Sequence, residues 1–196
     1  MKSIIYLHGF NSSPQSEKAT LTQAYLSEHA GLSVHVPSLT AAPLDAIASV
    51  HQLVEQIGVK HLAGFIGSSL GGFYSLYLQH YYSQVGVQAK TVLINPAIRP
   101  YELLLDYLGE NQNLYTGERY YVDHSHMAEL QSLVVPPHNR PQQTLLLTQT
   151  HDEVLDYQQA VSFLDGSSMW IHYGGSHAFD NYRQVLPLIR SFLLSA

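Results

Sequence analysis

Short apolar runs recur along the chain and alternate with longer stretches in which apolar positions have helical spacing. Runs of four or five residues without polar alternation are typical of parallel strands that helices cover on both faces. The runs that predict strands are residues 4–7, 33–36, 62–66, 91–94, 144–147 and 169–172. This order predicts an α/β fold of about six parallel strands, with functional residues in the loops that follow the strands.

The stretches between these runs predict the helices at residues 14–29, 44–57, 70–82, 156–164 and 181–194. We expect Ser13 to cap the first helix, with Pro14 at its first position, where the missing N–H of proline does no harm. Asp156 and Gln159 form an expected capping pair at the start of the fourth helix.

Residues 95–141 interrupt the alternation, because this segment is too long for a simple crossover. We expect short helices near residues 101–108 and 125–133 within it. A long insertion beside a functional face is often a lid or a specificity element, and the alternative is a surface-covering excursion. The sequence leaves both interpretations open.

The composition predicts one globular domain over residues 1–196. The chain is 45% hydrophobic and only 12% charged, whereas disordered chains combine low hydrophobicity with high charge. Its formal net charge is −6 and Lys and Arg form no cluster, which disfavours nucleic acid as a partner. The absence of cysteine excludes disulfides, thiolate metal sites and a Cys nucleophile.

The N-terminal apolar run is far too short for a signal peptide. No stretch approaches the roughly 20 apolar residues that would span a bilayer. We therefore expect a cytoplasmic protein without a membrane span.

The residues after the third predicted strand match the pattern G-x-S-x-G, with Ser69 at its centre. This strand-to-helix turn holds the serine in a strained conformation, and the glycines on either side leave room for the chain to fold tightly. The hydroxyl then projects above the sheet, beside a helix N-terminus that favours developing negative charge. The motif predicts a nucleophile, and the alternative is a turn that merely caps a helix.

The first predicted strand runs into His8, Gly9 and Phe10, where the glycine lets the loop pass close to a nucleophile. We expect the backbone N–H groups of Phe10 and Leu70 to form an oxyanion hole, in which one donor contributes roughly 3–4 kcal/mol of transition-state stabilisation. We expect His8 to be a buried histidine that orients the loop and transfers no proton.

A serine nucleophile needs a base, and the chain order in this architecture is serine, acid and then histidine. Of the twelve histidines, His177 alone lies in a glycine-rich loop after the last predicted strand, on the same face as Ser69. His29, His51 and His80 fall inside predicted helices and are expected at the surface.

Three carboxylates after the fifth predicted strand compete for the role of the acid. Asp152 lies where a carboxylate can accept from the imidazole and hold its tautomer. Asp156 has a sufficient role as a helix cap and remains the alternative, whereas Glu153 is expected to be solvated. The predicted catalytic residues are Ser69, Asp152 and His177.

These loops together resemble the α/β-hydrolase fold superfamily, and more closely the small YqiA-type esterases. The resemblance covers nearly the whole chain, and it implies that Ser69 is the nucleophile, Asp152 the acid and His177 the base. One departure is His151, where the family more often has glycine. The segments that carry the resemblance are Tyr6-Leu7-His8-Gly9-Phe10-Asn11-Ser12-Ser13-Pro14, Gly67-Ser68-Ser69-Leu70-Gly71-Gly72, Asn95-Pro96-Ala97-Ile98-Arg99-Pro100, Asp106-Tyr107-Leu108-Gly109, Asp152-Glu153-Val154-Leu155-Asp156-Tyr157 and Gly175-Ser176-His177-Ala178-Phe179.

The expected function is a serine esterase that hydrolyses short- to medium-chain acyl esters through an acyl-serine intermediate, without cofactor or metal. The alternatives are an acyl-CoA thioesterase with the same residues and a non-catalytic binding protein on the same fold. A metalloenzyme is disfavoured because His124 and His126 stand without an H-E-x-x-H motif or a nearby carboxylate cluster. Arg99 could bind an anionic substrate group or form a structural salt bridge.

Overall fold

A six-stranded sheet forms the centre of the computed structural model, which describes residues 2–28, 32–113, 115–136 and 140–195. Its strand order is β2-β1-β3-β4-β7-β8, and each neighbouring pair is parallel. All six predicted strands and the α/β fold class are confirmed. The strands are β1 (Lys2–Leu7), β2 (Leu32–His35), β3 (Leu62–Ser68), β4 (Lys90–Ile94), β7 (Thr144–Gln149) and β8 (Ser168–His172).

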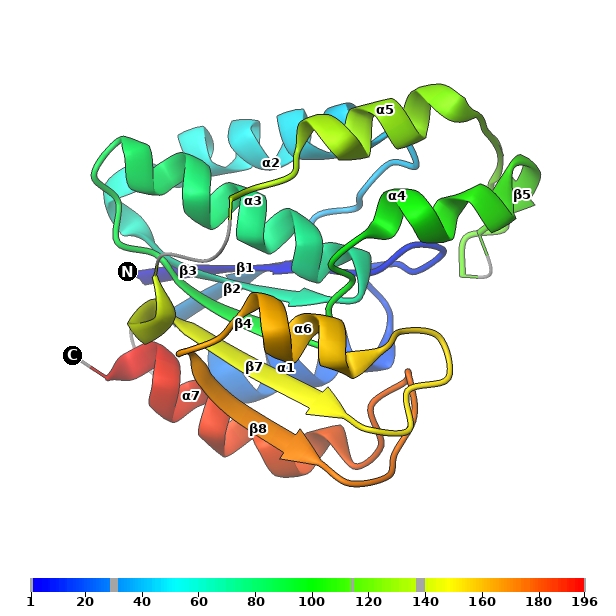
Figure 1. Cartoon of the computed structure of the whole chain (residues 1–196). Coiled ribbons are helices and arrows are strands. Elements are labelled where there is room, and N and C mark those ends of the chain that lie inside the picture. The colour runs from blue at the N-terminus through cyan, green and yellow to red at the C-terminus, as the bar shows by residue number, and fades with distance from the viewer. Residues whose placement is uncertain (1, 29–31, 114, 137–139, 196) are drawn as a thin grey trace.

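Helices cover both faces of this sheet, as predicted (Figure 1). On one side lie α2, α3, α5 and α6, and on the other lie α1 and α7. No helix within the described ranges is long and apolar enough to cross a membrane. The helices are α1 (Glu17–Ser27), α2 (Pro43–Ile57), α3 (Leu70–Gln84), α4 (Pro100–Leu103), α5 (His124–Ser132), α6 (Tyr157–Phe163) and α7 (Leu186–Leu194).

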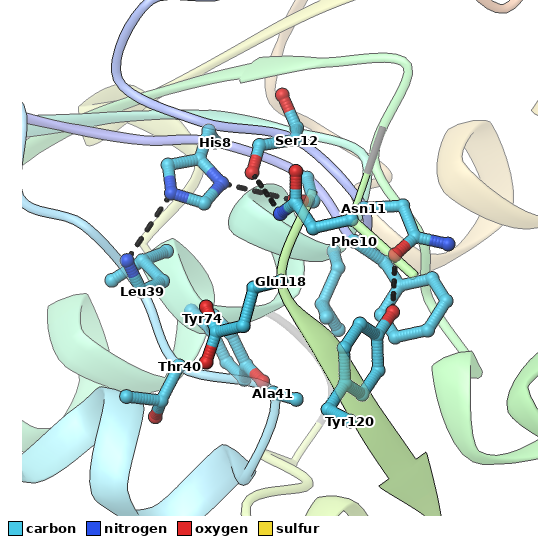
Figure 2. Close-up of a pocket in the computed structure, with 13 residues that line it drawn as sticks. His8, Phe10, Asn11, Ser12, Leu39, Thr40, Ala41, Tyr74, Glu118 and Tyr120 are labelled. Atoms are coloured by element: carbon cyan, nitrogen blue, oxygen red, sulfur yellow. Dashed lines mark hydrogen bonds between the residues drawn. The ribbon is translucent and has the colours of Figure 1, made fainter. Parts of the chain in front are cut away.

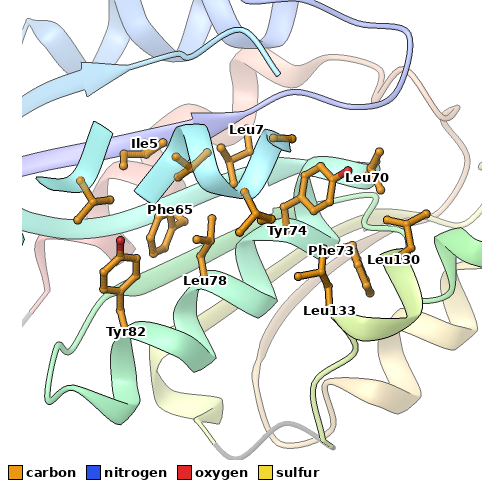
Figure 3. Close-up of a cluster of buried hydrophobic side chains, with 14 of the residues drawn as sticks. Ile5, Leu7, Phe65, Leu70, Phe73, Tyr74, Leu78, Tyr82, Leu130 and Leu133 are labelled. Atoms are coloured by element: carbon orange, nitrogen blue, oxygen red, sulfur yellow. The ribbon is translucent and has the colours of Figure 1, made fainter. Parts of the chain in front are cut away.

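The side chains of β1 alternate between two hydrophobic layers. Ile5 and Leu7 pack in the layer with α2 and α3 (Figure 3), whereas Ile4 and Tyr6 pack in the layer with α1 and α7. Since a strand turns successive side chains to opposite faces, a strand buried on both faces must be apolar throughout. The edge strand β8 is the exception, because its Ile171 is 45% exposed.

The predicted start of the first helix is wrong by three residues. α1 begins at Glu17, directly after Ser16, and Ser13 caps nothing. Ser13 instead begins a turn, in which its carbonyl accepts the N–H of Ser16 and its hydroxyl accepts the N–H of Gln15. These local bonds compete with helix formation, as is usual for serine. The predicted end at residue 29 lies outside the described residues.

Capping and proline explain where the later helices begin. Asp156 caps α6 as predicted, through a bond from the N–H of Gln158 to its carboxylate, but among the described residues no bond from the Gln159 side chain completes the expected capping pair. The last predicted helix is divided into a 3-10 turn (Tyr182–Val185) and α7. Pro187 explains the division, because a proline is tolerated in the first turn of an α-helix but not in its interior.

The segment of residues 95–141 contains a β-hairpin that was not predicted. α4, with the 3-10 turn Leu104–Tyr107, occupies the first expected helical position, and α5 occupies the second. Between them, β5 (Gly109–Gln112) pairs antiparallel with β6 (Arg119–Val122). Because β5 has the sequence Gly-Glu-Asn-Gln, it carries no apolar run and therefore no strand signal.

We expect Leu78→Ala to destabilise the fold strongly, because Leu78 is fully buried in the layer between α3 and the sheet (Figure 3). Removing such a side chain costs about 2–5 kcal/mol of unfolding free energy. Leu188→Ala in α7 is the control, since Leu188 is 37% exposed and should cost less than about 1 kcal/mol. Urea denaturation measures both values, and equal losses would contradict this account of the core.

Candidate active site

Ser69 lies at the turn between β3 and α3, at the carboxyl edge of the sheet. Its φ of +54° and ψ of −120° are a strained backbone conformation for a non-glycine residue. Gly67 and Gly71 make the turn possible by having no Cβ. A Cβ on Gly67 would lie 2.1 Å from the carbonyl oxygen of Gly71, and one on Gly71 would lie 2.0 Å from that of Leu7. The turn therefore packs directly on the end of β1.

Three predicted side chains meet at this edge, each from a loop that follows a different strand. The Nε2 atom of His177 lies 3.1 Å from Oγ of Ser69. Its Nδ1 atom lies 2.9 Å from Oδ2 and 3.0 Å from Oδ1 of Asp152. The Asp152 side chain is 1% exposed and that of His177 is 24% exposed. A buried carboxylate, an imidazole and a hydroxyl thus form a continuous hydrogen-bonded chain that reaches solvent at the imidazole.

The buried carboxylate of Asp152 has further partners within its own loop. Its Oδ1 atom accepts the N–H of Val154 at 2.9 Å and that of Leu155 at 2.8 Å. The residue before it, His151, is exposed, and its ring packs at 5.0 Å on that of Tyr173. The histidine therefore stands at this position without displacing Asp152 from His177. Burial of the carboxylate is tolerated because its oxygens are hydrogen-bonded.

The other two carboxylates of this loop have different hydrogen-bond partners from those of Asp152. Asp156 accepts the backbone N–H of Gln158, which is the capping role predicted for it. Glu153 is exposed, as expected of a solvated side chain, and it also makes a contact that the sequence analysis did not predict. Its Oε2 atom accepts the backbone N–H of His177 at 2.9 Å. Glu153 therefore helps to hold the histidine loop.

Two buried amides that the sequence analysis missed also hold this loop. Asn95 donates through Nδ2 to the carbonyl oxygens of Ser176 at 3.0 Å and His177 at 3.3 Å. Gln149 accepts through Oε1 from the N–H groups of Ser176 at 3.1 Å and Asp180 at 2.8 Å, and donates through Nε2 to the carbonyl of Asp180 at 2.9 Å. The signal that could have found them is a polar residue at the end of a buried apolar run.

The same loop depends on a glycine and on a cation from α1. Gly175 has a φ of +78°, and a Cβ there would lie 2.0 Å from Oε1 of Gln149. Lys18 donates through Nζ to the carbonyl of Ala178 at 2.8 Å. Burial lowers the pKa of Lys18, and the charges of Asp152 and Glu17 act in the opposite direction.

His8 is buried beside the loop that follows β1, as expected. Its Nε2 atom accepts the N–H of Leu39 at 3.2 Å, and its Nδ1 atom lies 3.0 Å from the carbonyl oxygen of Gly9. A ring with one accepting and one donating nitrogen is neutral. Burial lowers the pKa of His8 below its usual 6.5, which agrees with this neutral form.

The remaining candidates have structural contacts elsewhere. Arg99 forms an exposed salt bridge of 3.5 Å with Glu102, so the structural alternative is the observed one.

His51 is half-buried, contrary to expectation, with Nδ1 2.8 Å from the Tyr82 hydroxyl, and His80 is likewise only partly exposed. His29 lies outside the described residues. Within the described part of the chain, no group of three His, Cys, Asp or Glu side chains could hold a metal ion.

A cleft of about 370 Å³ opens beside Ser69 and His177. Residues 8–12 form one wall, and Lys18 and Tyr115 lie among the other lining residues. A second cavity of about 40 Å³ is also lined by residues 8–12, together with side chains of the hairpin (Figure 2). The loop after β1 therefore lines both a cleft of small-molecule size and a much smaller cavity.

We expect Gln149→Leu to lower the unfolding free energy by about 2–4 kcal/mol, because it leaves buried polar groups of the His177 loop without partners. Gln159→Leu is the matched control, since Gln159 is exposed on α6 and its loss should cost about 0.5 kcal/mol or less. Urea denaturation measures both. A loss at Gln149 no larger than at Gln159 would show that this network contributes nothing.

We expect His8 to make the protein less stable as the pH falls. In the unfolded chain His8 binds a proton near pH 6.5, whereas burial keeps it neutral to a lower pH in the fold. The unfolded state thus binds more protons below pH 6.5, so stability is lost as the pH falls through that value. Between about pH 7.5 and 5.5, the unfolding free energy of His8→Gln should fall less than that of wild type. An identical pH dependence would refute this, because all other histidines are common to both proteins.

Solved structures with similar folds come from several bacteria. Est1E from Butyrivibrio proteoclasticus has a TM-score of 0.75 at 15% identity, over 98% of this chain and 87% of that chain. An esterase domain from Rhodothermus marinus has a TM-score of 0.69 at 16% identity, over 97% and 85%. XC6422 from Xanthomonas campestris, described as an α/β serine hydrolase without lid, has a TM-score of 0.66 at 17% identity, over 99% and 83%. At these identities the likeness establishes the fold, which is that of the α/β hydrolases.

The sequence itself matches one family model over almost its entire length, from residue 3 to residue 194. That family has the description "uncharacterised protein family (UPF0227)" and corresponds to the YqiA-type resemblance of the sequence motifs. This chain therefore belongs to the UPF0227 family, and its fold is that of the α/β hydrolases.

Proposed function

We propose that this protein is a serine hydrolase that cleaves short- to medium-chain acyl esters. The observation that carries the proposal is the hydrogen-bonded chain from Asp152 through His177 to Ser69. An isolated serine hydroxyl is a weak nucleophile, and a base within hydrogen-bond reach, itself oriented by a third group, is what activates it. The esterases among the structures of similar fold support the same class of reaction.

In this reaction Oγ of Ser69 attacks the ester carbonyl carbon while Nε2 of His177 takes the hydroxyl proton. Asp152 accepts from Nδ1, holds the imidazole in the required tautomer and stabilises the imidazolium that forms. The tetrahedral intermediate collapses as His177 returns the proton to the leaving alcohol, which leaves an acyl group on Ser69. His177 then takes a proton from water, whose oxygen attacks the acyl carbon, and the acid departs as Ser69 regains its proton.

The negative oxygen of the intermediate would be held by the N–H groups of Phe10 and Leu70. Leu70 is the first residue of α3, so its N–H has no acceptor within the helix. Phe10 follows Gly9, where a Cβ would lie only 3.1 Å from Cβ of Ser69. The loop therefore passes close enough for a second donor, and each donor of this kind contributes roughly 3–4 kcal/mol.

The cleft supports a small-molecule substrate. Its volume of about 370 Å³ falls in the range of small-molecule sites and allows acyl groups of modest length. The same residues would cleave an acyl thioester, because the attack and the proton transfers are unchanged when a thiol leaves in place of an alcohol.

We expect a fluorophosphonate probe to modify wild-type protein at Ser69, because the probe reacts with activated serines without requiring the substrate. Ser69→Ala should take no label, and His177→Ala should react more slowly by about 10³-fold or more, since its base is absent. Peptide mapping by mass spectrometry locates the label. Folded wild-type protein that stays unlabelled would refute the hydrolase proposal and favour a non-catalytic binding role.

A further inference from the structure

The loop that carries Phe10 is in contact with the β5–β6 hairpin, about a hundred residues away in the sequence. Figure 2 shows the hydroxyl of Tyr120, on β6, pointing toward the side chain of Asn11. Tyr120 donates a hydrogen bond to Oδ1 of Asn11. Burial raises the pKa of Tyr120 to about 12, so the hydroxyl keeps its proton and remains a donor at neutral pH.

Aromatic packing adds a second contact between the same two segments. The ring of Phe10 meets the ring of Tyr120 edge to face, with centroids 5.9 Å apart and planes at 88°. It also meets the ring of Tyr107, just before the hairpin, at 5.1 Å and 71°. Edge-to-face pairs at these separations are favourable beyond the area they bury. The side chain of Phe10 is therefore held on two sides by the segment of residues 95–141.

The turn of the hairpin makes a third contact. Asn113 donates through Nδ2 to the carbonyl oxygen of Ser12 at 2.9 Å. Asn113 is itself fixed, because its Oδ1 atom accepts the N–H groups of Tyr115 at 2.8 Å and Thr116 at 3.0 Å. The donor to Ser12 thus comes from a side chain whose oxygen is itself hydrogen-bonded within the hairpin.

The backbone of the loop turns sharply at Asn11. Asn11 has a φ of +52°, in the left-handed region that asparagine tolerates better than most other non-glycine residues. On its other side the loop is held by His8, through Leu39. Three contacts from the hairpin, to Phe10, Asn11 and Ser12, hold the loop on the opposite side.

We propose that the β5–β6 hairpin positions the loop of residues 8–12, which carries the Phe10 N–H of the oxyanion hole. Tyr120 and Asn113 are the positioning residues that fix this N–H for catalysis. The proposal rests on the function proposed above. It assigns the segment of residues 95–141 a part in building the site, in addition to any role in covering it. Neither residue touches the reacting atoms, so both act through the backbone of residues 10–12.

The test is Tyr120→Phe, which removes only the hydroxyl, with Tyr121→Phe as its control. Tyr121 is the next residue of β6 and is 63% exposed, so it undergoes the same chemical change away from the loop. With para-nitrophenyl acetate as substrate, kcat of Tyr120→Phe should fall by about 10- to 100-fold with KM nearly unchanged, as a misplaced catalytic group predicts. Tyr121→Phe should keep both constants.

A measurement that does not need activity accompanies the kinetics. Backbone ¹⁵N relaxation should give order parameters near the rigid value of about 0.85 for Phe10 and Asn11 in wild type, and clearly lower values in Tyr120→Phe. Asn113→Asp is the second variant, because it keeps the oxygen that accepts from Tyr115 and Thr116 and replaces the donor to Ser12 with a carboxylate oxygen, which repels that carbonyl. It should also loosen the loop.

Each outcome decides the proposal. Unchanged order parameters in both variants would overturn the positioning role, and so would looser loops with unchanged kcat in an enzyme that is active. If wild type hydrolyses no ester and takes no fluorophosphonate, the proposed function fails. In that case the order parameters still determine whether the hairpin holds the loop.

Discussion

The site depends on the close contact between the first turn of α3 and the end of β1. A Cβ on Gly71 would lie only 2.0 Å from the carbonyl oxygen of Leu7, so the two backbones are in direct contact. This approach holds Ser69 at a φ of +54° above the edge of the sheet. It also brings the loop after β1 close to Ser69, so that this loop and the turn after β3 lie side by side.

Around this contact, the buried polar side chains of Asp152, Asn95 and Gln149 are hydrogen-bonded. The carboxylate of Asp152 has two backbone donors and an imidazole. The side chain of Asn95 accepts the backbone N–H of Gln149, and the side-chain amides of both residues bond to the His177 loop. Buried polar groups are costly unless paired, so a network of this kind is stable in one geometry only. The position of the imidazole is therefore determined by the ends of β4 and β7 as much as by its own loop.

The segment of residues 95–141 contributes from outside the sheet. Its hairpin is polar along β5 and carries Tyr120 on β6, which joins the partly buried side chains packed against the hydrophobic layer of α2 and α3. Through Tyr120 and Asn113 it reaches the loop after β1, whose residues also line the cleft. Two supports thus hold the loops at this edge of the sheet: the strand ends hold the His177 loop, and the hairpin contacts the loop after β1.

The sequence by itself determined the six strands, the fold class, the turn at Ser69 and the choice of His177 and Asp152 as its neighbours. These features follow from unbroken apolar runs, from a glycine pattern and from position after a strand, all of which are local. Tertiary structure alone decided the hairpin, the later start of α1, and the roles of Asn95, Gln149 and Glu153. Asn95 and Gln149 are 54 residues apart, and their bond exists only because parallel strand ends meet at one edge. The local periodicity of the sequence does not predict such contacts, because they depend on the register and the close approach of distant segments.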